Sequence, residues 1–490
     1  MSHKFVVGLD IGTTSAKAVV FDMDGKVRAE AEQLIKTYHP QQGWAEQDPD
    51  ELERAAVHAI RMVMDKANVP KEEIVGMGFS CAMHSLICVA GKGEVLSRAL
   101  IWSDGRSSGQ AEKLLEAEGE ELFQRTGVPI HPMSPLVKLL WMKETNYEPY
   151  RNAQYFMSVK EYILMKWFGK KVADYSIAAA SGLMNAETLQ WDEKALALVN
   201  VKKKQLSDIV PPTEILSGLN NDLAEEMGIL PETPVAIGSA DGQLANLGIG
   251  AISPGEVAIT VGTSGAVRQF ANGFRINDKR ETFCYAFSED YSIIGGATNN
   301  GGIALQWLKE LVNYPGSYEE FLVEAEEVAP GAEGMIFLPY INGERAPIWN
   351  QQATGNFSGV SITHKQEHFI RAVLEGITFN LYQIEQALER LAGKSETIYV
   401  NGGLARSPIW LQMLADIFGK EVYVAETHHS SAWGAAWTAL VAIGKVNSFE
   451  EIKHSVNLGN AITPNEENHH VYQEIYKKYT RLVEDISVHF

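Results

Sequence analysis

A short turn near the start of the chain combines residues that could bind a phosphate group and a metal ion. The apolar run Phe5–Leu9 leads into Asp10, which is followed by Gly12, Thr13 and Thr14. Glycine lets a ligand approach the backbone, and the turn offers the N–H groups and hydroxyls that a phosphate needs. A carboxylate such as Asp10 can face a hydrated Mg²⁺, which typically binds only one or two carboxylates. A plain hairpin turn with a capping aspartate is the alternative, and this motif alone does not decide between them.

Two later glycine-containing segments have a similar character. Gly262-Thr263-Ser264-Gly265 follows the apolar run 256–261, as the first turn follows its own strand. Together, the two turns predict a pair of phosphate loops that close on one nucleotide. Gly402-Gly403 precedes Ser407, a predicted helix N-cap, and so places a positive helix end near a ligand-accessible edge. A tight strand-to-helix connection is the commoner meaning of such a segment. A P-loop kinase is disfavoured, because the sequence contains no GxxxxGK[ST] segment.

Asp241 is the candidate general base. It stands between an apolar strand and a helix rich in small residues, where a carboxylate could accept the proton of an attacking hydroxyl. A helix N-cap is the simpler explanation of the same residue. Met83, His84 and the aromatic Trp102 are candidates for contact with a small substrate. A lone histidine, however, is more often a structural residue.

The elements that must position these residues form two similar units. Apolar runs at 5–9 and 18–21 within residues 4–30 predict an antiparallel meander whose first turn is rich in Gly, Thr and Ser, and the runs at 256–261 and 266–268 form a second unit that resembles it. The architecture therefore looks duplicated, with a boundary near residue 250. Beyond it we expect a strand at 397–400, a helix from Pro408 to about Phe418, a strand at 421–424, a packed helix at 431–443 and a closing helix over 471–488.

Composition indicates an ordinary globular protein of more than one domain. The chain has 490 residues, of which 45% are hydrophobic and 21% charged. Its formal net charge of −20 disfavours nucleic acid and anionic membrane as partners, and any anionic ligand needs local cations or backbone N–H groups. No apolar run is long enough for a membrane span or a secretory signal, so we expect a cytoplasmic protein. The three cysteines form no CxxC pair, which argues against a disulfide framework and a zinc site.

Taken together and in order, six segments resemble the FGGY carbohydrate kinases. Each segment is weak by itself, but the ordered set is specific and spans residues 4 to about 450: Leu9–Ser15, Trp102–Arg106, Asp241–Gly242, Gly262–Ser264, Gly343–Trp349 and Asn401–Gly403. The resemblance implies an α/β fold of two actin-like ATPase (ribonuclease H-like) domains flanking a cleft. We place the first domain at 1–248, mainly on the sugar side, and the second at 249–490, mainly on the nucleotide side.

The resemblance also implies roles for individual residues, with ATP and Mg²⁺ as cofactors. Asp241 corresponds to the catalytic base, and Asp10 and Asp241 to the carboxylates on the metal side. The positions implied for the nucleotide are Asp10, Gly12, Thr13, Thr14, Lys17, Gly262, Thr263, Gly302, Gln306, Gly402, Gly403 and Ser407. The positions implied for the acceptor are Met83, His84, Trp102, Lys160 and Asp241.

Within the family, the stretches 80–86, 130–136 and 160–163 look most like those of gluconokinases. We therefore expect phosphorylation of D-gluconate to 6-phospho-D-gluconate, with His84, Lys160 or Lys138 as the cation for its carboxylate. Another ketose or polyol, such as xylulose, is the alternative acceptor. A sugar sensor that binds nucleotide without catalysis, and an actin-like ATPase, are alternatives of another class. The expected partners are small molecules, and a homodimer is left open.

Overall fold

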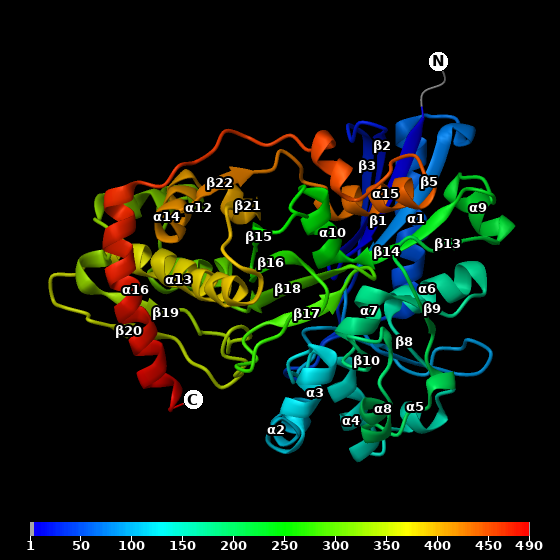
Figure 1. Ribbon diagram of the computed structural model, residues 1–490, viewed down its shortest axis with the longest axis horizontal. Coiled ribbons are helices and arrows are strands. Elements are labelled where there is room, and N and C mark those ends of the chain that lie inside the picture. Colours follow the sequence, from blue (N-terminus) through cyan, green and yellow to red (C-terminus); the bar gives the residue numbers. More distant parts are fainter. Residues whose placement is uncertain (1–3, 490) are drawn as a thin grey trace.

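The chain folds around two six-stranded sheets, each covered by helices. A computed structural model describes residues 4–489, and Figure 1 shows the two sheets in separate lobes. The strand orders are β13-β14-β5-β1-β2-β3 in the first sheet and β17-β18-β16-β15-β21-β22 in the second. The predicted α/β architecture of two actin-like domains is confirmed.

The first sheet places an antiparallel hairpin beside parallel strands. Strands β1 and β2 are antiparallel, β1 is parallel to β5, and β5 is parallel to β14. The parallel strands consist almost entirely of buried residues, most of them apolar, as expected where a sheet is covered on both faces. The bounds are β1 Phe5–Ile11, β2 Ser15–Asp22, β3 Val27–Leu34, β5 Ile74–Cys81, β13 Ile215–Leu216 and β14 Val235–Ala240.

Helix α1, Pro49–Ala67, packs against β2 and β3. Its start is encoded locally, because the Asp48 side chain accepts hydrogen bonds from the first free N–H groups and Pro49 occupies the first turn. Asn68, in the left-handed conformation, ends the helix.

The second sheet repeats this plan. Strands β15 and β16 form the antiparallel hairpin, and β15 is parallel to β21, which is parallel to β22. The duplication predicted from the two hairpins is therefore present. The bounds are β15 Glu256–Val261, β16 Gly265–Asn272, β17 Phe283–Ala286, β18 Tyr291–Thr298, β21 Thr397–Gly402 and β22 Glu421–Val424.

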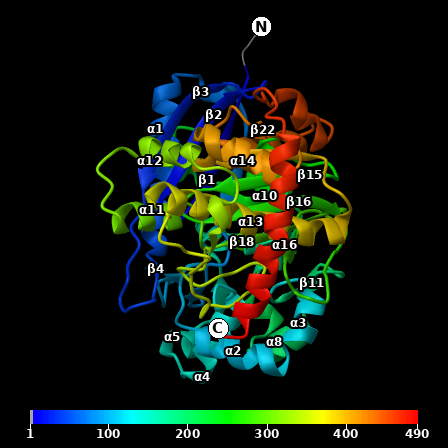
Figure 2. The same cartoon turned by 90° about the vertical axis from the view of Figure 1, so that its left-hand side faces the viewer.

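Two helices pack against strands of this second sheet, and a third packs against one of these two helices. They are α13 Gln366–Ala392, α14 Pro408–Phe418 and α16 Glu466–Ser487, and Figure 2 shows α16 crossing the outer face of the lobe. Helix α14 begins and ends where the sequence predicts, with Ser407 as its N-cap. Helix α16 includes the predicted closing helix and begins five residues earlier than expected.

Shorter elements complete both lobes. Those between residues 87 and 210 form the lower part of the first lobe in Figure 1. The remaining bounds are β4 Glu46–Gln47, β6 Ile87–Val89, β7 Ala99–Leu100, α2 Ser108–Ala117, α3 Gly119–Thr126, α4 Pro135–Glu144, α5 Glu148–Asn152, β8 Tyr155–Met157, α6 Val159–Phe168, β9 Val172–Asp174, α7 Tyr175–Ala180, β10 Met184–Asn185, β11 Gln190–Trp191, α8 Glu193–Leu198, β12 Asp208–Val210, α9 Asn221–Met227, α10 Asp241–Gly248, α11 Gly302–Leu311, α12 Tyr318–Val323, β19 Ile336–Leu338, β20 Asn356–Ser358 and α15 Ser430–Ala442.

Helix α15 lies far along the chain but packs on the first sheet. It contacts β1, β5, β14 and α10, and its orange ribbon lies among the blue strands in Figure 1. The helix comes so close that a Cβ at Gly8 would overlap the carbonyl of Ala432, and a Cβ at Gly78 would overlap that of Ala435. Glycine at these two strand positions therefore permits the contact that ties the late segment to the first lobe.

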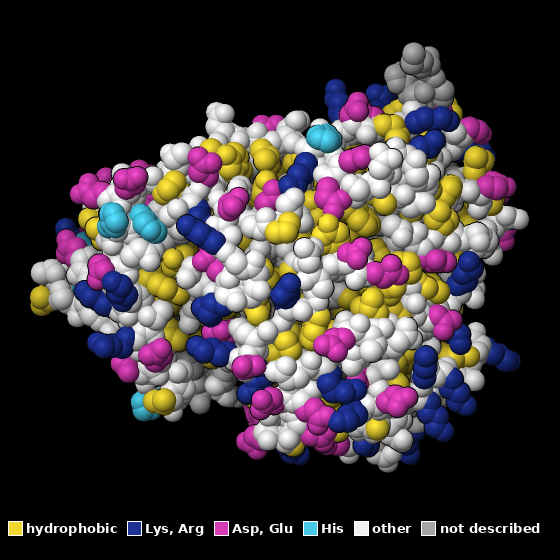
Figure 3. Space-filling view, viewed as in Figure 1, with side chains coloured by type: hydrophobic (Ala, Val, Ile, Leu, Met, Phe, Trp, Pro, Cys, Tyr) yellow, Lys and Arg dark blue, Asp and Glu magenta, His cyan; other side chains and the backbone are white. Residues whose placement is uncertain are grey.

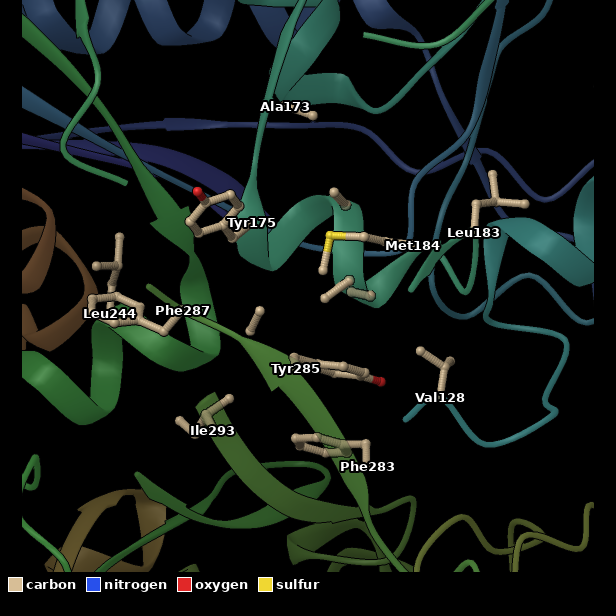
Figure 4. Packing of buried hydrophobic residues seen from close by; sticks show 14 of the residues in the cluster. Val128, Ala173, Tyr175, Leu183, Met184, Leu244, Phe283, Tyr285, Phe287 and Ile293 are labelled. Carbon is tan, nitrogen blue, oxygen red and sulfur yellow. The ribbon is translucent and has the colours of Figure 1, made fainter. Parts of the chain in front are cut away.

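An apolar cluster joins the two lobes below the cleft. Figure 4 shows Phe283 and Tyr285 of β17 close to Met184 and Val128 of the first lobe, and all four belong to one buried cluster. The rings of Phe283 and Tyr285 stack with centroids 4.3 Å apart. Strand β17 thus anchors one wall of the cleft to the opposite lobe.

The surface carries charges of both signs. On the face shown in Figure 3, acidic and basic side chains are intermixed rather than segregated. Among residues 4–489, no helix is long and apolar enough to cross a membrane.

The packing of α15 on the first sheet leads to a stability prediction. We expect Gly78→Ala to lower the free energy of unfolding by about 1–3 kcal/mol, because the new methyl group has no room beside the Ala435 carbonyl. Denaturant midpoints measured by circular dichroism provide the test.

Gly109→Ala is the matched control, because Gly109 lies in helix α2 and a Cβ added there would have no atom within 4 Å. This variant should be as stable as the unmodified protein or slightly more stable. Equal midpoints for the two variants would show that the close approach of α15 is not required.

Candidate active site

The two aspartates singled out in the sequence meet at one edge of the first sheet. Asp10 lies near the end of β1 and Asp241 directly after β14, and these strands flank β5 on either side. Ser80 of β5 is in register with both Asp10 and Ser239, two residues before Asp241. Because the carboxyl ends of parallel strands share one edge, the topology brings both carboxylates to the cleft.

The carboxylates interact electrostatically. The pKa of Asp10 is raised to about 6, chiefly by burial and also by the charge of Asp241, against a 2.7 Å hydrogen bond from the Ser80 hydroxyl and the charge of Lys17. Burial also raises the pKa of Asp241, while the positive charge of Arg268 opposes this effect. Two neighbouring carboxylates in a poorly solvated place favour a cation beside them.

This donor set fits Mg²⁺. Among residues 4–489 there is no group of three or more His, Cys, Asp or Glu side chains that could enclose a metal. Two carboxylate oxygens suit a hard cation that keeps most of its waters and takes its remaining ligands from a phosphate tail. Asp10 and Asp241 could therefore hold Mg²⁺ in the presence of a nucleotide.

One cavity lies within the second lobe. It has a volume of about 450 Å³ and is lined by six of the predicted nucleotide residues, Gly262, Thr263, Gly302, Gln306, Gly403 and Ser407. Its wall also includes apolar side chains, among them Leu322, Val323 and Trp410. Glycine backbone, hydroxyls and an apolar wall are suited to a nucleotide with its phosphates at one end.

The turn between β15 and β16 is held at the mouth of this cavity by helix α11. The amide of Gly302 donates to the Gly262 carbonyl at 2.7 Å, and the amide of Ile303 donates to the Thr263 carbonyl at 3.1 Å. A Cβ at Gly302 would stand 2.8 Å from the Gly262 oxygen, so the contact depends on glycine. Gly402 is absent from the cavity lining, but its left-handed backbone (φ 83°) turns β21 toward Gly403.

The turn between β1 and β2 lies on the other side of the cleft. The Trp102 indole N–H donates to the Thr13 hydroxyl at 2.9 Å, and Gln47 donates to the Thr13 carbonyl at 2.6 Å. Thr14 is exposed. Lys17 of β2 stands opposite Asp10 of β1 in the register of the antiparallel strands. Gly12 and Thr13 line a small void beneath Met83 and Trp102. A hydrogen bond therefore connects Thr13, in the first predicted phosphate loop, to Trp102, which is predicted to contact the acceptor.

A second cavity lies between the lobes. It has a volume of about 360 Å³, and Gly262 lines both this cavity and the one in the second lobe, so the two adjoin. From the first lobe it is lined by Thr13, Met83, His84, Trp102 and Asp241. Arg268, Tyr285 and Arg345 complete the lining from the second lobe. We call it the acceptor cavity.

His84 faces the acceptor cavity as a neutral imidazole. Its Nδ1 lies 2.9 Å from the carbonyl of Ala180, so Nδ1 carries the proton and Nε2 is left as an acceptor. The pKa of His84 is lowered to about 3, chiefly by burial, and the positive charge of Lys138 contributes to the decrease. His84 can accept a hydrogen bond from a substrate hydroxyl, but it cannot supply the positive charge expected of it.

The two lysines expected to meet a carboxylate lie outside the cavity. Lys160 is 1% exposed and pairs with Asp174 at 2.7 Å, and it also donates to the Ser239 carbonyl at 3.2 Å. Lys138 is fully buried and donates to the carbonyls of His84, Leu100 and Ile101 at 2.6, 3.3 and 2.8 Å. Lys160 and Lys138 do not line the acceptor cavity, because both ammonium groups are used within the fold.

Sequence reasoning missed the two arginines that do line the cavity. Arg268 is the only charged residue of strand β16, and a cation in a largely buried strand is a signal for a functional role. Arg345 lies in the segment Gly343–Trp349, which the sequence singled out without assigning it a role.

Comparison with known proteins agrees with this geometry. Residues 5–248 match the N-terminal domain, and residues 257–443 the C-terminal domain, of the FGGY family of carbohydrate kinases. The gluconokinase of Bacillus licheniformis is 41% identical over 492 residues, which cover 98% of this chain and 95% of that protein.

Solved structures show the same fold. The gluconate kinase of Lactobacillus acidophilus superposes with a TM-score of 0.96 at 32% identity, covering 99% of both chains. A ligand-bound xylulose kinase from the same organism also reaches a TM-score of 0.96 at 32% identity, covering 99% of this chain and 98% of that one. The chain therefore belongs to the FGGY family of carbohydrate kinases and is an ATP-dependent sugar kinase.

Proposed function

We propose that this sugar kinase phosphorylates D-gluconate on its terminal hydroxyl to give 6-phospho-D-gluconate. The observation that carries the proposal is that Gly262 lines both cavities, so the phosphate end of a nucleotide and an acceptor in the second cavity would meet beside Asp241. The gluconokinase that is 41% identical over nearly the whole chain supports gluconate as the acceptor.

In the proposed reaction, Asp241 is the general base. The terminal hydroxyl oxygen of the acceptor forms a bond to the γ-phosphorus of ATP as the bond from that phosphorus to the β,γ-bridging oxygen breaks, and ADP leaves. The hydroxyl proton passes to the Asp241 carboxylate. A base whose pKa is raised by burial is better matched to this task than an exposed aspartate.

Charge neutralisation and positioning account for the rest of the barrier. Mg²⁺ bound near Asp10 and Asp241 would neutralise charge on the phosphate oxygens. The turns at Gly12–Thr14 and Gly262–Ser264 present backbone and hydroxyl donors from opposite sides of the cleft. Since both turns follow rigid strands, their donors are positioned before the nucleotide arrives.

Polar contacts join the two lobes at the mouth of the cleft. The Ser108 hydroxyl donates to the side-chain carbonyl of Gln351 at 2.8 Å, and the amide of Gln351 lies 3.3 Å from His131 Nε2. These polar contacts lie at the mouth, where a cavity of about 650 Å³ shares Trp102 and Arg345 with the acceptor cavity. Keeping water from the γ-phosphate protects ATP from hydrolysis while the acceptor is bound.

Xylulose or another neutral ketose or polyol is the second candidate acceptor, and the L. acidophilus xylulose kinase with the same fold is the observation that favours it. A nucleotide-binding sensor or an actin-like ATPase would bind ATP but form no sugar phosphate.

A coupled assay of ADP release over gluconate, xylulose, ribulose and glycerol tests the proposal. We expect the highest kcat/KM with gluconate, and mass spectrometry should identify the product as 6-phosphogluconate. A higher kcat/KM with xylulose would transfer the proposal to that acceptor. ADP release that does not depend on any acceptor would contradict a kinase function.

Replacing the base gives a second prediction. Asp241→Asn should lower kcat by at least about 10²-fold, because the amide cannot accept the hydroxyl proton, while ATP binding persists. Asp24→Asn in the exposed turn after β2 is the matched control and should keep normal turnover. Near-normal turnover of Asp241→Asn would remove this residue from the mechanism.

The neutral state of His84 gives a third prediction. Because its pKa lies near 3, the imidazole stays deprotonated from pH 8 down to pH 5. In protein with ¹³C-labelled histidine, the ring signal that disappears in His84→Gln should keep a constant chemical shift over this range. A titration midpoint between pH 5 and pH 8 would restore His84 as a cation for the acceptor.

A further inference from the structure

Two guanidinium groups line the acceptor cavity without forming an ion pair with a carboxylate. Arg268 and Arg345 both line it, and within residues 4–489 neither has a carboxylate oxygen within 4.0 Å. Other buried arginines of this chain are paired: Arg106 with Asp104 at 2.8 Å and Arg371 with Glu375 at 2.8 Å. An unpaired buried charge is unfavourable, so the exception at the acceptor cavity requires a reason.

Arg345 is fixed in position by its neighbours. Its Nη2 donates to the Thr298 carbonyl at 3.1 Å, and its guanidinium carbon lies 5.2 Å from the centre of the Trp102 ring. The adjacent Glu344 does not pair with the guanidinium, because its carboxylate accepts from the donors Thr298, Asn299, Asn300, Asn380 and the Arg345 backbone N–H. The buried Nε of Arg345 has no hydrogen-bond partner among the described residues.

Arg268 is the freer of the two groups. Its side chain makes no hydrogen bond to any residue in the described part of the chain, and its guanidinium lies against the backbone of Gly242. A Cβ at Gly242 would stand 2.9 Å from Arg268 Nε and 3.3 Å from its Nη2. The guanidinium group of Arg268 therefore lies in the lining of the acceptor cavity, against the residue that follows Asp241.

The two arginines also repel each other. The pKa of Arg345 is lowered to about 10, chiefly by burial, and the positive charge of Arg268 contributes to the decrease. At neutral pH both groups remain protonated. An anion between them would replace this repulsion with two attractions, and a carboxylate is the planar anion that a guanidinium binds best through two parallel hydrogen bonds.

We propose that Arg268 binds the carboxylate of the acceptor, with Arg345 as the second positive group, and thereby selects sugar acids over neutral sugars. This inference rests on the proposed phosphorylation of gluconate and adds the residue that recognises its acid group. Arg268 would also supply the local cation that an anionic substrate needs in a chain with a net charge of −20.

The matched pair of acceptors for the test is gluconate and D-glucitol, in which an uncharged CH₂OH group replaces the carboxylate. The measured quantity is the ratio of kcat/KM for gluconate to kcat/KM for glucitol. We expect Arg268→Gln to lower this ratio by about 10²-fold, as is usual when one partner of a buried charge pair is removed. Arg268→Lys should lower it less, since it keeps the charge but not the planar pair of donors.

Arg275→Gln provides the control, because it removes the same charge from an exposed position seven residues further along the same lobe. Its ratio should equal that of the unmodified protein. ATP affinity and the thermal midpoint, measured for every variant, identify any loss of folding.

The alternative role for Arg268 is to hold Asp241 ionised. In that case Arg268→Gln would lower kcat/KM equally for both acceptors and leave their ratio unchanged. This result would overturn the inference but would not contradict the phosphorylation of gluconate. Failure of the unmodified protein to phosphorylate gluconate would instead contradict the proposed function. If gluconate is not phosphorylated, the role of Arg268 predicts that the acceptor is another sugar acid. A neutral acceptor would overturn the role proposed for Arg268.

Discussion

The proposed phosphoryl transfer depends on the convergence of two carboxylates at the carboxyl edge of the parallel strands of the first sheet. Asp10 and Asp241 are 231 positions apart in the chain, yet they lie at the ends of strands that flank β5, and the charge of Asp241 raises the pKa of Asp10. Bringing like charges together in a poorly solvated place is unfavourable in the isolated protein. The fold tolerates it because Ser80 donates to Asp10 and because Lys17 and Arg268 supply opposite charge nearby.

In the proposed reaction, the second lobe contributes the other half of the site. Its hairpin places Gly262–Ser264 opposite Gly12–Thr14, and its strand β16 delivers Arg268 to the cavity that Asp241 lines. Helix α15 returns to the first sheet through the close approach at Gly8 and Gly78, so the lobes are joined by packed structure on both sides of the cleft. The geometry of transfer is therefore maintained by cores that lie outside the site itself.

Local signals allowed much of the fold to be predicted. Ser407 and Pro408 set the start of α14, and the glycine-rich turns after β1 and β15 identified both hairpins, because each of these features depends only on neighbouring residues. The sheet on which α15 packs was not predictable, since an Ala-rich helix looks the same whichever sheet it covers. Tertiary structure alone decides that question.

At the candidate site, too, only part of the arrangement could be predicted from the sequence. The turn residues and Asp241 were proposed from the sequence because their types and their places after strands indicate their chemistry. The ion pair of Lys160 with Asp174 could not be predicted, because this buried partner is recognisable only when the fold is known. Arg268 was not proposed from the sequence, because a sequence does not reveal which cations lack an ion pair in the folded protein.

The most direct test of the central claim is a crystal structure with Mg²⁺, a non-hydrolysable ATP analogue and gluconate. The quantity to measure is the distance from the terminal hydroxyl oxygen of gluconate to the nearest carboxylate oxygen of Asp241. The account predicts about 2.6–3.2 Å, the range of a hydrogen bond to a general base, with the γ-phosphate analogue on the other side of that hydroxyl. A terminal hydroxyl that is directed away from Asp241, with no hydrogen bond to it, would contradict the account.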